Sequence, residues 1–262
     1  MSTHSARRRV LVTGATGDIG TVLVPRLARD YDVVPHGRTA PQGQAPDGLR
    51  QADLTDYDAV RALMEGMEVV VHLAGSASPE SSWEDVLSAN IIGLRNVLEA
   101  AREAGVRRVV YASSNHAMGM YDRLGQWPVY PHHLPRPDSL YGVSKVFGEV
   151  LGRFYHDEFG LEFIALRIGW STGDIGAADT DVLRAMWLSE DDTEQVVRCA
   201  IEAEVGYGVY YAISDNPNRR WDLTNAMLEL GYRPKDSWTD AMGEPEQIVE
   251  GGEPAPENWP AT

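Results

Sequence analysis

The sequence has very few lysines and almost no cysteine. Among its 262 residues there are two lysines, Lys145 and Lys235, and one cysteine, Cys199. A single cysteine excludes an intrachain disulfide, which suits a reducing compartment. Residues 1–9 lack the apolar core of a signal peptide, and no apolar run approaches the length of a membrane span. We therefore expect a cytoplasmic protein that does not bind membranes.

Basic residues of any kind are in short supply. The chain has 39 acidic residues against 23 lysines and arginines, a formal net charge of -16. Such a surface repels nucleic acid and anionic membranes, so we expect neither as a partner. Abundant acid with almost no lysine is typical of proteins from salt-loving organisms. The alternative is an ordinary acidic protein from a GC-rich genome, in which arginine replaces lysine.

The sequence does contain a regular alternation of short apolar runs and amphipathic segments. We expect strands at residues 9–13, 32–36, 68–73, 108–113, 162–167 and 208–213. We expect helices at residues 18–30, 56–66, 83–105, 140–159, 192–204 and 222–230. This alternation predicts an α/β fold, a Rossmann-type doubly wound parallel sheet with helices on both faces. It divides the chain into a dinucleotide-binding core (1–170), a small substrate-binding lobe interleaved with the core (171–235) and a surface tail (236–262).

A glycine-rich loop follows the first expected strand. Gly14, Gly17 and Gly20 lie three residues apart, between that strand and a helix. The first glycine permits a tight turn, the second lets backbone N–H groups approach a pyrophosphate, and the third allows close packing of helix on strand. The helix N-terminus also favours the phosphate charge. The loop therefore predicts a dinucleotide site, rather than an ordinary glycine-rich turn, with Asp18 and Ile19 as further contacts.

The end of the second strand bears on the choice of dinucleotide. An acid at that point would bind the adenosine ribose of NAD, but the chain has Arg38 there and no nearby acid until Asp47. Arg38 can form charge-assisted bonds to the 2′-phosphate of NADP. If Arg38 is only a solvated surface residue, NAD remains the alternative. The fourth strand ends in Leu73, Ala74 and Gly75, where small residues would let the backbone pass close to either cofactor; the alternative is simply a tight strand exit.

Tyr141 and Lys145 are spaced to lie on one face of a helix. A tyrosine has a pKa of about 10, too high for a base at neutral pH, and an adjacent lysine ammonium lowers it. The alternative is a surface Tyr–Lys pair. Lysine is scarce in this chain, and the strand that precedes the pair ends in a polar cluster at residues 112–116. Both observations favour a catalytic pair.

In this order, the motifs resemble the extended short-chain dehydrogenase/reductase superfamily, in its epimerase/dehydratase-like branch. The resemblance covers residues 9–170 and rests on the glycine loop, residues 72–75, Asn90 with Gly93, Ser113 with Ser114, and Tyr141 with Lys145. Residues 112–119, 136–145 and 166–169 resemble uronate dehydrogenase and sugar dehydrogenases of salt-loving archaea, L-arabinose 1-dehydrogenase and glucose-6-phosphate dehydrogenase. Residues 153–157, 185–189 and 213–216 extend this resemblance to about residue 235.

The resemblance implies roles by position. Tyr141 would be the base, Lys145 its partner on the nicotinamide ribose, and Ser114 rather than Ser113 the hydrogen-bonding serine. Further implied cofactor contacts are Asp53, Leu54, Asn90 and Ile168. The implied sugar contacts are Ser76, Ser114, Asn115, His116 and Tyr141. Asp53 as a helix cap, Asn115 as a turn former and His116 as a structural histidine are the alternatives. The resemblance also implies a homo-oligomer, a dimer or tetramer formed through helices 83–105 and 140–159, and we expect no metal.

One departure from the uronate dehydrogenase pattern concerns the substrate. The arginine that grips the carboxylate in that family is Val182 here, and Arg184 lies two residues further along, a rotation of about 200° on a helix. Loss of that arginine removes the strongest partner for an anion. We therefore expect NAD(P)-dependent oxidation of a neutral aldose at its anomeric carbon, with L-arabinose first and D-galactose or D-xylose next. A uronate or glucose 6-phosphate substrate is the alternative, with Arg184 gripping the anion if this segment is not helical. Further alternatives are a nucleotide-sugar epimerase or dehydratase and a non-catalytic NAD(P) sensor.

Overall fold

Seven parallel strands form a sheet in the computed structural model, which describes residues 7–40, 45–171, 175–178 and 180–242. Their order across the sheet is β3-β2-β1-β4-β5-β6-β9. They are β1 (Arg9–Thr13), β2 (Asp32–Gly37), β3 (Arg50–Gln51), β4 (Val69–His72), β5 (Arg108–Ser114), β6 (Glu162–Ile168) and β9 (Tyr207–Ala212). The order reverses between β1 and β4, which places a crevice at the carboxyl ends of the strands. The predicted doubly wound Rossmann-type sheet is confirmed.

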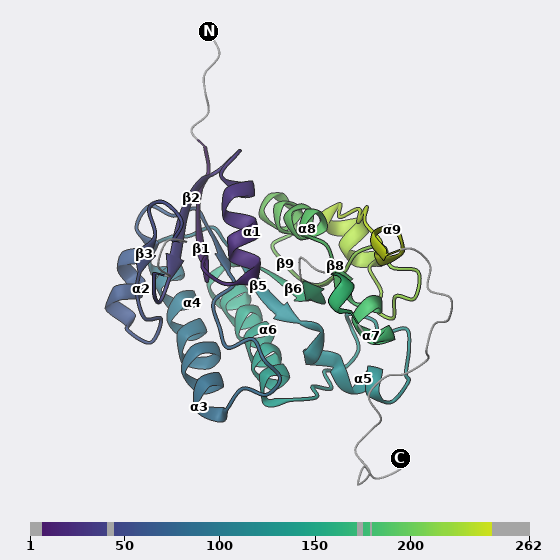
Figure 1. Ribbon diagram of the computed structural model, residues 1–262. Helices are drawn as coiled ribbons and strands as arrows, with labels where there is room; N and C mark the ends of the chain where they lie inside the picture. The colour runs from purple at the N-terminus through teal and green to yellow at the C-terminus, as the bar shows by residue number, and fades with distance from the viewer. Residues whose placement is uncertain (1–6, 41–44, 172–174, 179, 243–262) are drawn as a thin grey trace.

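Helices cover both faces of this sheet (Figure 1). One face carries α1 (Asp18–Leu27) and α8 (Glu190–Glu202). The other carries α2 (Tyr57–Met64), α4 (Gly93–Glu103) and α6 (Leu140–Phe159). Side chains of a strand alternate between the faces, so Val10 and Val12 join the core under α1 and α8, and Leu11 joins the opposite core. None of the described helices is long and apolar enough to cross a membrane.

Side-chain caps explain where the helices begin. Ser139 accepts a hydrogen bond from the Gly142 N–H at 3.0 Å, and Gly160 ends α6 with a φ of 72°. The predicted bounds of this helix, 140–159, match the observed ones. Helix α8 begins and ends two residues earlier than predicted, because Ser189 is its cap and accepts from the Asp192 N–H at 3.0 Å.

The helix expected at residues 83–105 changes its hydrogen-bonding pattern along its length. It begins as α3 (Trp83–Asp85), continues as the π-helix η1 (Val86–Ile92) and ends as α4. Such π segments occur often at functional sites. Asn90 lies within this one and is buried.

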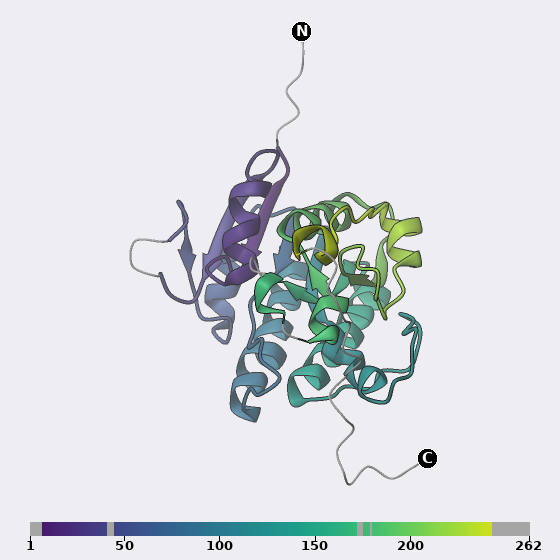
Figure 2. The same cartoon turned by 45° about the vertical axis from the view of Figure 1, so that its right-hand side comes forward.

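The chain after β6 adds smaller elements. Strand β7 (Trp170–Ser171) pairs with β8 (Trp187–Leu188) in a second, two-stranded sheet. The remaining elements are η2 (Asn115–Met118), α5 (Gly119–Arg123), η3 (Ile175–Ala177), α7 (Asp181–Ala185), η4 (Ala226–Leu230) and α9 (Trp238–Met242). In Figure 2 the green-to-yellow C-terminal segment lies on one side of the molecule and the purple α1 and its neighbouring strands on the other.

The predicted boundary between the core and the substrate-binding lobe separates strands of one and the same large sheet. Residues 171–235 supply β9, which pairs with β6 inside that sheet, and also supply the small sheet strand β8. Of the predicted tail, residues 236–242 pack against the fold, and Trp238 is almost fully buried. Residues 243–262 lie outside the described residues, and the division itself remains a prediction.

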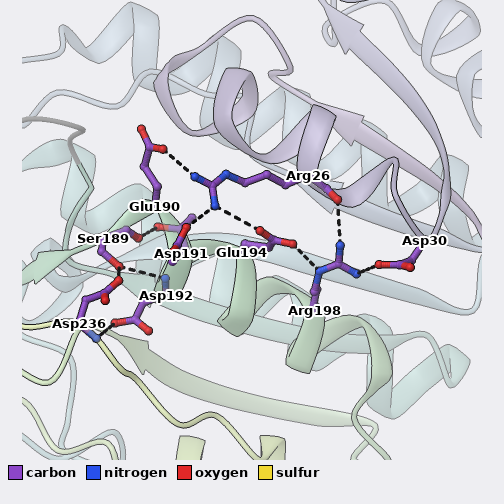
Figure 3. Close-up of polar contacts among 10 residues, drawn as sticks. Arg26, Asp30, Ser189, Glu190, Asp191, Asp192, Glu194, Arg198 and Asp236 are labelled. Carbon is purple, nitrogen blue, oxygen red and sulfur yellow. Dashed lines mark hydrogen bonds and ion pairs between the residues drawn. The ribbon is translucent and has the colours of Figure 1, made fainter.

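A network of ion pairs joins α1 to α8 (Figure 3). Arg26 on α1 contacts three carboxylates in the first turns of α8: Glu190, Asp191 and Glu194. Arg198 on α8 binds Glu194 at 2.8 Å and donates to the backbone carbonyl of Arg26 at 2.9 Å. The network ties the helix after the glycine loop to the C-terminal part of the chain.

Candidate active site

A cavity of about 810 Å³ opens at the carboxyl ends of the strands. Most of the residues predicted from the sequence to bind cofactor or substrate line it: Gly14, Gly17, Asp18, Ile19, Gly20, Arg38, Asp53, Leu54, Leu73, Ala74, Gly75, Ser76, Ser114, Tyr141, Lys145 and Ile168. Three predicted residues, Asn90, Asn115 and His116, do not line it. The fold therefore gathers into one space residues from both ends of the predicted core.

The glycine loop forms one end of the cavity. Gly14 has a φ of 72°, and a Cβ there would lie 2.7 Å from the Ala74 nitrogen; a Cβ at Gly20 would lie 2.2 Å from the Gly14 oxygen. Both positions therefore require glycine. A Cβ at Gly17 would meet nothing closer than 3.5 Å, so space remains beside it. Gly17 caps α1 without a side chain, which leaves the first N–H groups of the helix free for an anion. These residues fit a dinucleotide pyrophosphate.

Two opposite charges lie where β2 and β3 end. Arg38 is exposed at the cavity. The Asp53 carboxylate accepts from the N–H and the hydroxyl of Thr55 at 2.9 and 2.8 Å. These bonds, with the charge of Arg38, lower the pKa of Asp53. The helix cap is Asp56, so Asp53 is not the cap of α2. The adenosine end of the cavity thus holds one cation and one carboxylate.

Lys145 and Tyr141 are buried at the centre of the cavity wall. Lys145 is 5% exposed, its Nζ donates to the Ala112 carbonyl at 2.7 Å, and it lies 5.4 Å from the centroid of the Tyr141 ring. Burial lowers the pKa of Lys145 to about 8, although the charge of Glu149 acts in the opposite direction.

The pKa of Tyr141 differs from the prediction made from its spacing to lysine. Burial raises it above its usual value, and a hydrogen bond with Ser114 offsets only part of this shift. The sequence predicted that Lys145 would lower it. Desolvation of the buried phenolate is the largest effect on this pKa, and Lys145 directs its Nζ to a carbonyl.

The two serines that end β5 lie in different surroundings. Ser114 lies beside Tyr141 and lowers its pKa; its hydroxyl donates to the Asn115 Oδ1 at 3.3 Å and accepts from the His116 N–H at 3.2 Å. Ser113 donates to Glu149 at 2.6 Å. The geometry places Ser114, the serine chosen from the resemblance, beside the tyrosine.

Asn90 supports the site from behind. Its Oδ1 accepts from the Ser76 N–H at 2.8 Å, and its Nδ2 donates to the Ser76 carbonyl at 3.0 Å and to the Ser144 hydroxyl at 2.9 Å. Asn90 thereby fixes the loop after β4 to helix α6. The side-chain amide of Asn90 is thus engaged with the protein. The contact with the cofactor that the resemblance implies for Asn90 remains a prediction.

Asn115 and His116 lie next to the cavity. The Asn115 Nδ2 is 2.8 Å from the sulfur of Met186. His116 binds Asp138 through Nδ1 at 2.9 Å, and its ring meets the ring of Tyr141 edge-on with centroids 5.7 Å apart. Their contact with a sugar remains a prediction.

Several residues around the site carried no clear signal in the sequence. Trp170 and Ser171 of β7 line the cavity, as does Thr16 in the glycine loop. The first two lie in a segment for which the sequence predicted neither strand nor helix. Glu149, four residues after Lys145 on α6, is buried and receives two hydrogen bonds from Arg167, at 2.9 and 2.8 Å. The spacing of four residues between Lys145 and Glu149 was the only signal in the sequence that pointed to Glu149.

The segment that carries Val182, at the position of the anion-binding arginine of uronate dehydrogenases, is helical. Val182 and Arg184 both lie on α7, and neither lines the cavity. The Arg184 Nε donates to the Ala178 carbonyl at 3.1 Å, and its guanidinium lies over the ring of Trp238. Among the described residues of the cavity wall, the lysine and arginine positions are Lys145 and Arg38. Arg38 lies at one end of the cavity. Trp170 lies at the other end, where a substrate would meet Tyr141.

Comparison with known proteins agrees with this geometry. The profile of the family described as "NAD dependent epimerase/dehydratase family" matches residues 10–196. The chain is 41% identical over 251 residues to an L-arabinose 1-dehydrogenase (NAD(P)(+)) of Haloferax volcanii, covering 87% of this chain and 97% of the relative. It is 38% identical over 257 residues to an NAD-dependent glucose-6-phosphate dehydrogenase of the same organism, covering 92% and 98%. The crystal structure of uronate dehydrogenase from Agrobacterium tumefaciens superposes with a TM-score of 0.82 at 37% identity, covering 96% of this chain and 92% of that one.

Proposed function

The chain belongs to the NAD dependent epimerase/dehydratase family, and we propose that it is an NAD(P)-dependent dehydrogenase that oxidises the anomeric carbon of an aldose to a lactone. The observation that carries this proposal is the grouping of Tyr141, Lys145 and Ser114 in the cavity that begins at the glycine loop. Similarity to several sugar dehydrogenases supports it.

The chemistry asks little of the protein beyond positioning and proton transfer. NAD(P), when bound, supplies a hydride acceptor. The phenolate of Tyr141 takes the proton of the anomeric hydroxyl, C1 loses a hydride, and the hydroxyl oxygen becomes the carbonyl oxygen of the lactone. Ser114 donates a hydrogen bond to that oxygen as the carbonyl forms, and the Lys145 ammonium stabilises the phenolate. One proton and one hydride leave the sugar, which accounts for both electrons.

We propose a neutral aldose as the substrate, with L-arabinose first and D-galactose or D-xylose next. The absence of an arginine from the described wall near Trp170, and the contacts of Arg184 with Ala178 and Trp238, support this choice. Relatives of comparable identity are named for a sugar phosphate and for uronate, so an anionic sugar is the alternative.

For the cofactor we propose NADP first and NAD second. Arg38 offers a charged partner for a 2′-phosphate. Asp53 works against it, because a carboxylate repels a phosphate and suits ribose hydroxyls. Arg38→Ala should therefore raise KM for NADP⁺ by about 10-fold, the loss of one charge-assisted bond, and change KM for NAD⁺ little.

The experiment is a matrix of initial rates in concentrated KCl. L-arabinose, D-galactose, D-xylose, glucose 6-phosphate and D-glucuronate are each paired with NAD⁺ and NADP⁺, for the wild type, Tyr141→Phe and Arg184→Ala. Turnover of a neutral sugar that Tyr141→Phe loses and Arg184→Ala keeps supports the proposal. Turnover of anionic sugars alone, abolished by Arg184→Ala, would replace the neutral substrate with an anionic one. No turnover of any sugar would overturn the proposed activity.

A further inference from the structure

The carboxylate of Asp138 is buried against His116, beside the proposed base. Its two oxygens lie 2.9 and 3.0 Å from the His116 Nδ1, and its side chain is 7% exposed. The Ser139 hydroxyl donates to the same carboxylate at 3.1 Å. Asp138 lies three residues before Tyr141, within residues 136–145, and the sequence predicted no role for it.

Two glycines leave the room that this pair occupies. A Cβ at Gly119 would lie 2.0 Å from an Asp138 oxygen, and a Cβ at Gly142 would lie 2.3 Å from the His116 carbonyl oxygen. Any larger residue at either position would displace Asp138 or His116. The backbone of three elements, η2, α5 and α6, is therefore fitted around this contact.

Asp138 is charged, which fixes the tautomer of a neutral His116. Burial opposes the charge, but the hydrogen bond and charge of His116 and the nearby Arg123 outweigh it, and the pKa of Asp138 is lowered. A carboxylate can only accept, so the Nδ1 of His116 carries the proton and donates. The other nitrogen, Nε2, is then left with a lone pair.

The pair also acts on Tyr141. The His116 ring meets the Tyr141 ring edge-on at 5.7 Å, and the charge of Asp138 raises the pKa of Tyr141. Other groups that face Tyr141 are Ser114, which lowers that pKa, Lys145 at 5.4 Å from the ring, and Tyr111. His116 thus packs against the residue that we propose as the base.

We propose that Asp138 is a positioning residue that holds His116 with Nε2 as a hydrogen-bond acceptor for the 2-hydroxyl of the sugar. The inference rests on the proposed function and adds a specificity element to it. A lone pair can accept from a hydroxyl but makes no hydrogen bond with a carboxylate or phosphate oxygen. Tyr141 would act on the hydroxyl of C1, and the neighbouring hydroxyl is that of C2, so we assign the hydroxyl of C2 to His116, the ring packed on Tyr141.

The test compares the best sugar substrate with its 2-deoxy form in wild type, Asp138→Ala and Asp138→Asn. Asp138→Ala should lower kcat/KM for the sugar about 100-fold and for the 2-deoxy sugar little, because the deoxy sugar lacks the recognised group. Asp138→Asn keeps an oxygen that accepts from Nδ1 and should keep most of the activity. Its rate–pH profile should move to lower pH, since the charge that opposes loss of a proton near Tyr141 is gone. Asp157→Asn is the matched control, because it removes an exposed carboxylate 16 residues along α6 from Tyr141, about 24 Å away.

Two measurements keep the outcome decisive. Thermal unfolding shows whether each variant folds, and ¹⁵N NMR of the His116 imidazole reports which nitrogen carries the proton without any turnover. Protonated Nδ1 in the wild type and a changed tautomer in Asp138→Ala support the positioning role. Equal losses on both sugars, or an Asp138→Asn profile that stays with the wild type, would overturn the inference. Inactivity of the wild type on every sugar would overturn the proposed function, while the NMR result still decides whether Asp138 sets the tautomer.

Discussion

Tyr141 and Lys145 are two titratable groups held close together, with the Lys145 Nζ 5.4 Å from the centroid of the Tyr141 ring. Loss of one proton gives two forms of equal net charge, phenolate with ammonium and phenol with neutral amine. Only the first form can act as a base with a stabilising partner. Burial sets the ease of that first loss, since it lowers the pKa of Lys145 to about 8 and raises that of Tyr141.

We expect kcat/KM for sugar oxidation to rise with pH through about 8, the pKa to which burial lowers Lys145. Below that value both protons are held and the base is absent. Initial rates between pH 6 and 10 give the apparent pKa, and Tyr141→Phe should lose about 1000-fold at every pH, the usual contribution of a general base. A rate that is flat from pH 6 to 9 would contradict this assignment.

His72 makes a separate contribution at the residue scale, to acid stability. It is buried on β4, its Nδ1 lies 2.8 Å from the Thr13 hydroxyl, and burial lowers its pKa to about 3. In the unfolded chain His72 binds a proton at about pH 6.5, but in the folded chain it does so only at about pH 3. The free energy of unfolding therefore falls as pH decreases through this window. The full difference corresponds to about 5 kcal/mol, of which about 3 kcal/mol is lost by pH 4.5.

His72→Gln should remove this titration while keeping an acceptor for Thr13. Urea unfolding at pH 7.0 and 4.5 measures the free energy of unfolding of both proteins. The wild type should lose about 3 kcal/mol more than the variant between the two pH values. Equal losses would show that His72 does not contribute to the pH dependence.

Residues singled out by local spacing were the ones whose position at the cavity the sequence predicted well. The glycine loop and the Tyr141–Lys145 pair follow from intervals of three and four residues, and both line the cavity. Asp138 and Trp170 were not identified. The contact of Asp138 with His116 spans 22 residues, and Trp170 reaches the cavity through a two-residue strand pair with a distant segment. Neither long-range contact leaves a periodic signal.

At the scale of elements, α6 shows both what caps predict and what they do not. Ser139 and Gly160 fix its ends, and its inner face carries the catalytic pair. Its outer face carries Val143, Val150 and Phe154, which with Ile92 of η1 are 42 to 65% exposed. This apolar stripe is unusual on a protein with a net charge of -16. We propose that it is the contact between two copies of the chain.

Val150→Glu should therefore yield a monomer, because it places a charge at the centre of the stripe. Light scattering after size-exclusion chromatography in 2 M KCl measures the mass. Leu228→Glu, which adds the same charge at a 77% exposed site on η4, should leave the oligomer intact. A monomeric wild type, or dissociation by both variants alike, would count against the stripe as the interface.

The same scale shows why the details of helices were harder to predict than their presence. Helix α8 is displaced by two residues because Ser189, and not a residue further on, caps it. The expected helix at 83–105 contains a π segment, since Asn90 is drawn inward to bind Ser76 and Ser144. Tertiary hydrogen bonds decide both features, and the apolar pattern alone does not contain them.

At the scale of the whole molecule, the excess of acid makes the few arginines important. Carboxylates on the surface repel one another. Salt screens this repulsion, with a Debye length of about 3 Å at 1 M. We therefore expect the temperature of thermal unfolding to rise between 0.1 and 2 M KCl. Arg26 pairs with three carboxylates at once in the network of Figure 3. Loss of its positive charge therefore exposes repulsion among all three carboxylates.

Arg26→Met should destabilise the protein by about 1 kcal/mol in 0.1 M KCl, and by less in 2 M KCl, where the freed carboxylates are screened. Chemical unfolding at both salt concentrations measures the difference. Arg153→Met, which breaks an exposed pair with Asp157, is the matched control and should cost about 0.3 kcal/mol or less. A loss for Arg26→Met that grows with salt would exclude the repulsion argument.

The position of β9 at the end of the sheet has a consequence for the birth of the chain on the ribosome. Arg108, at the start of β5, is 0% exposed and donates to the carbonyls of Ala200, Ile201 and Val205 at 2.7 to 3.1 Å. A nascent chain that ends before these residues leaves Arg108 with Glu162 but without its three backbone acceptors, and it leaves the edge of β6 open. The large sheet is therefore complete only after the chain up to β9 has been synthesised.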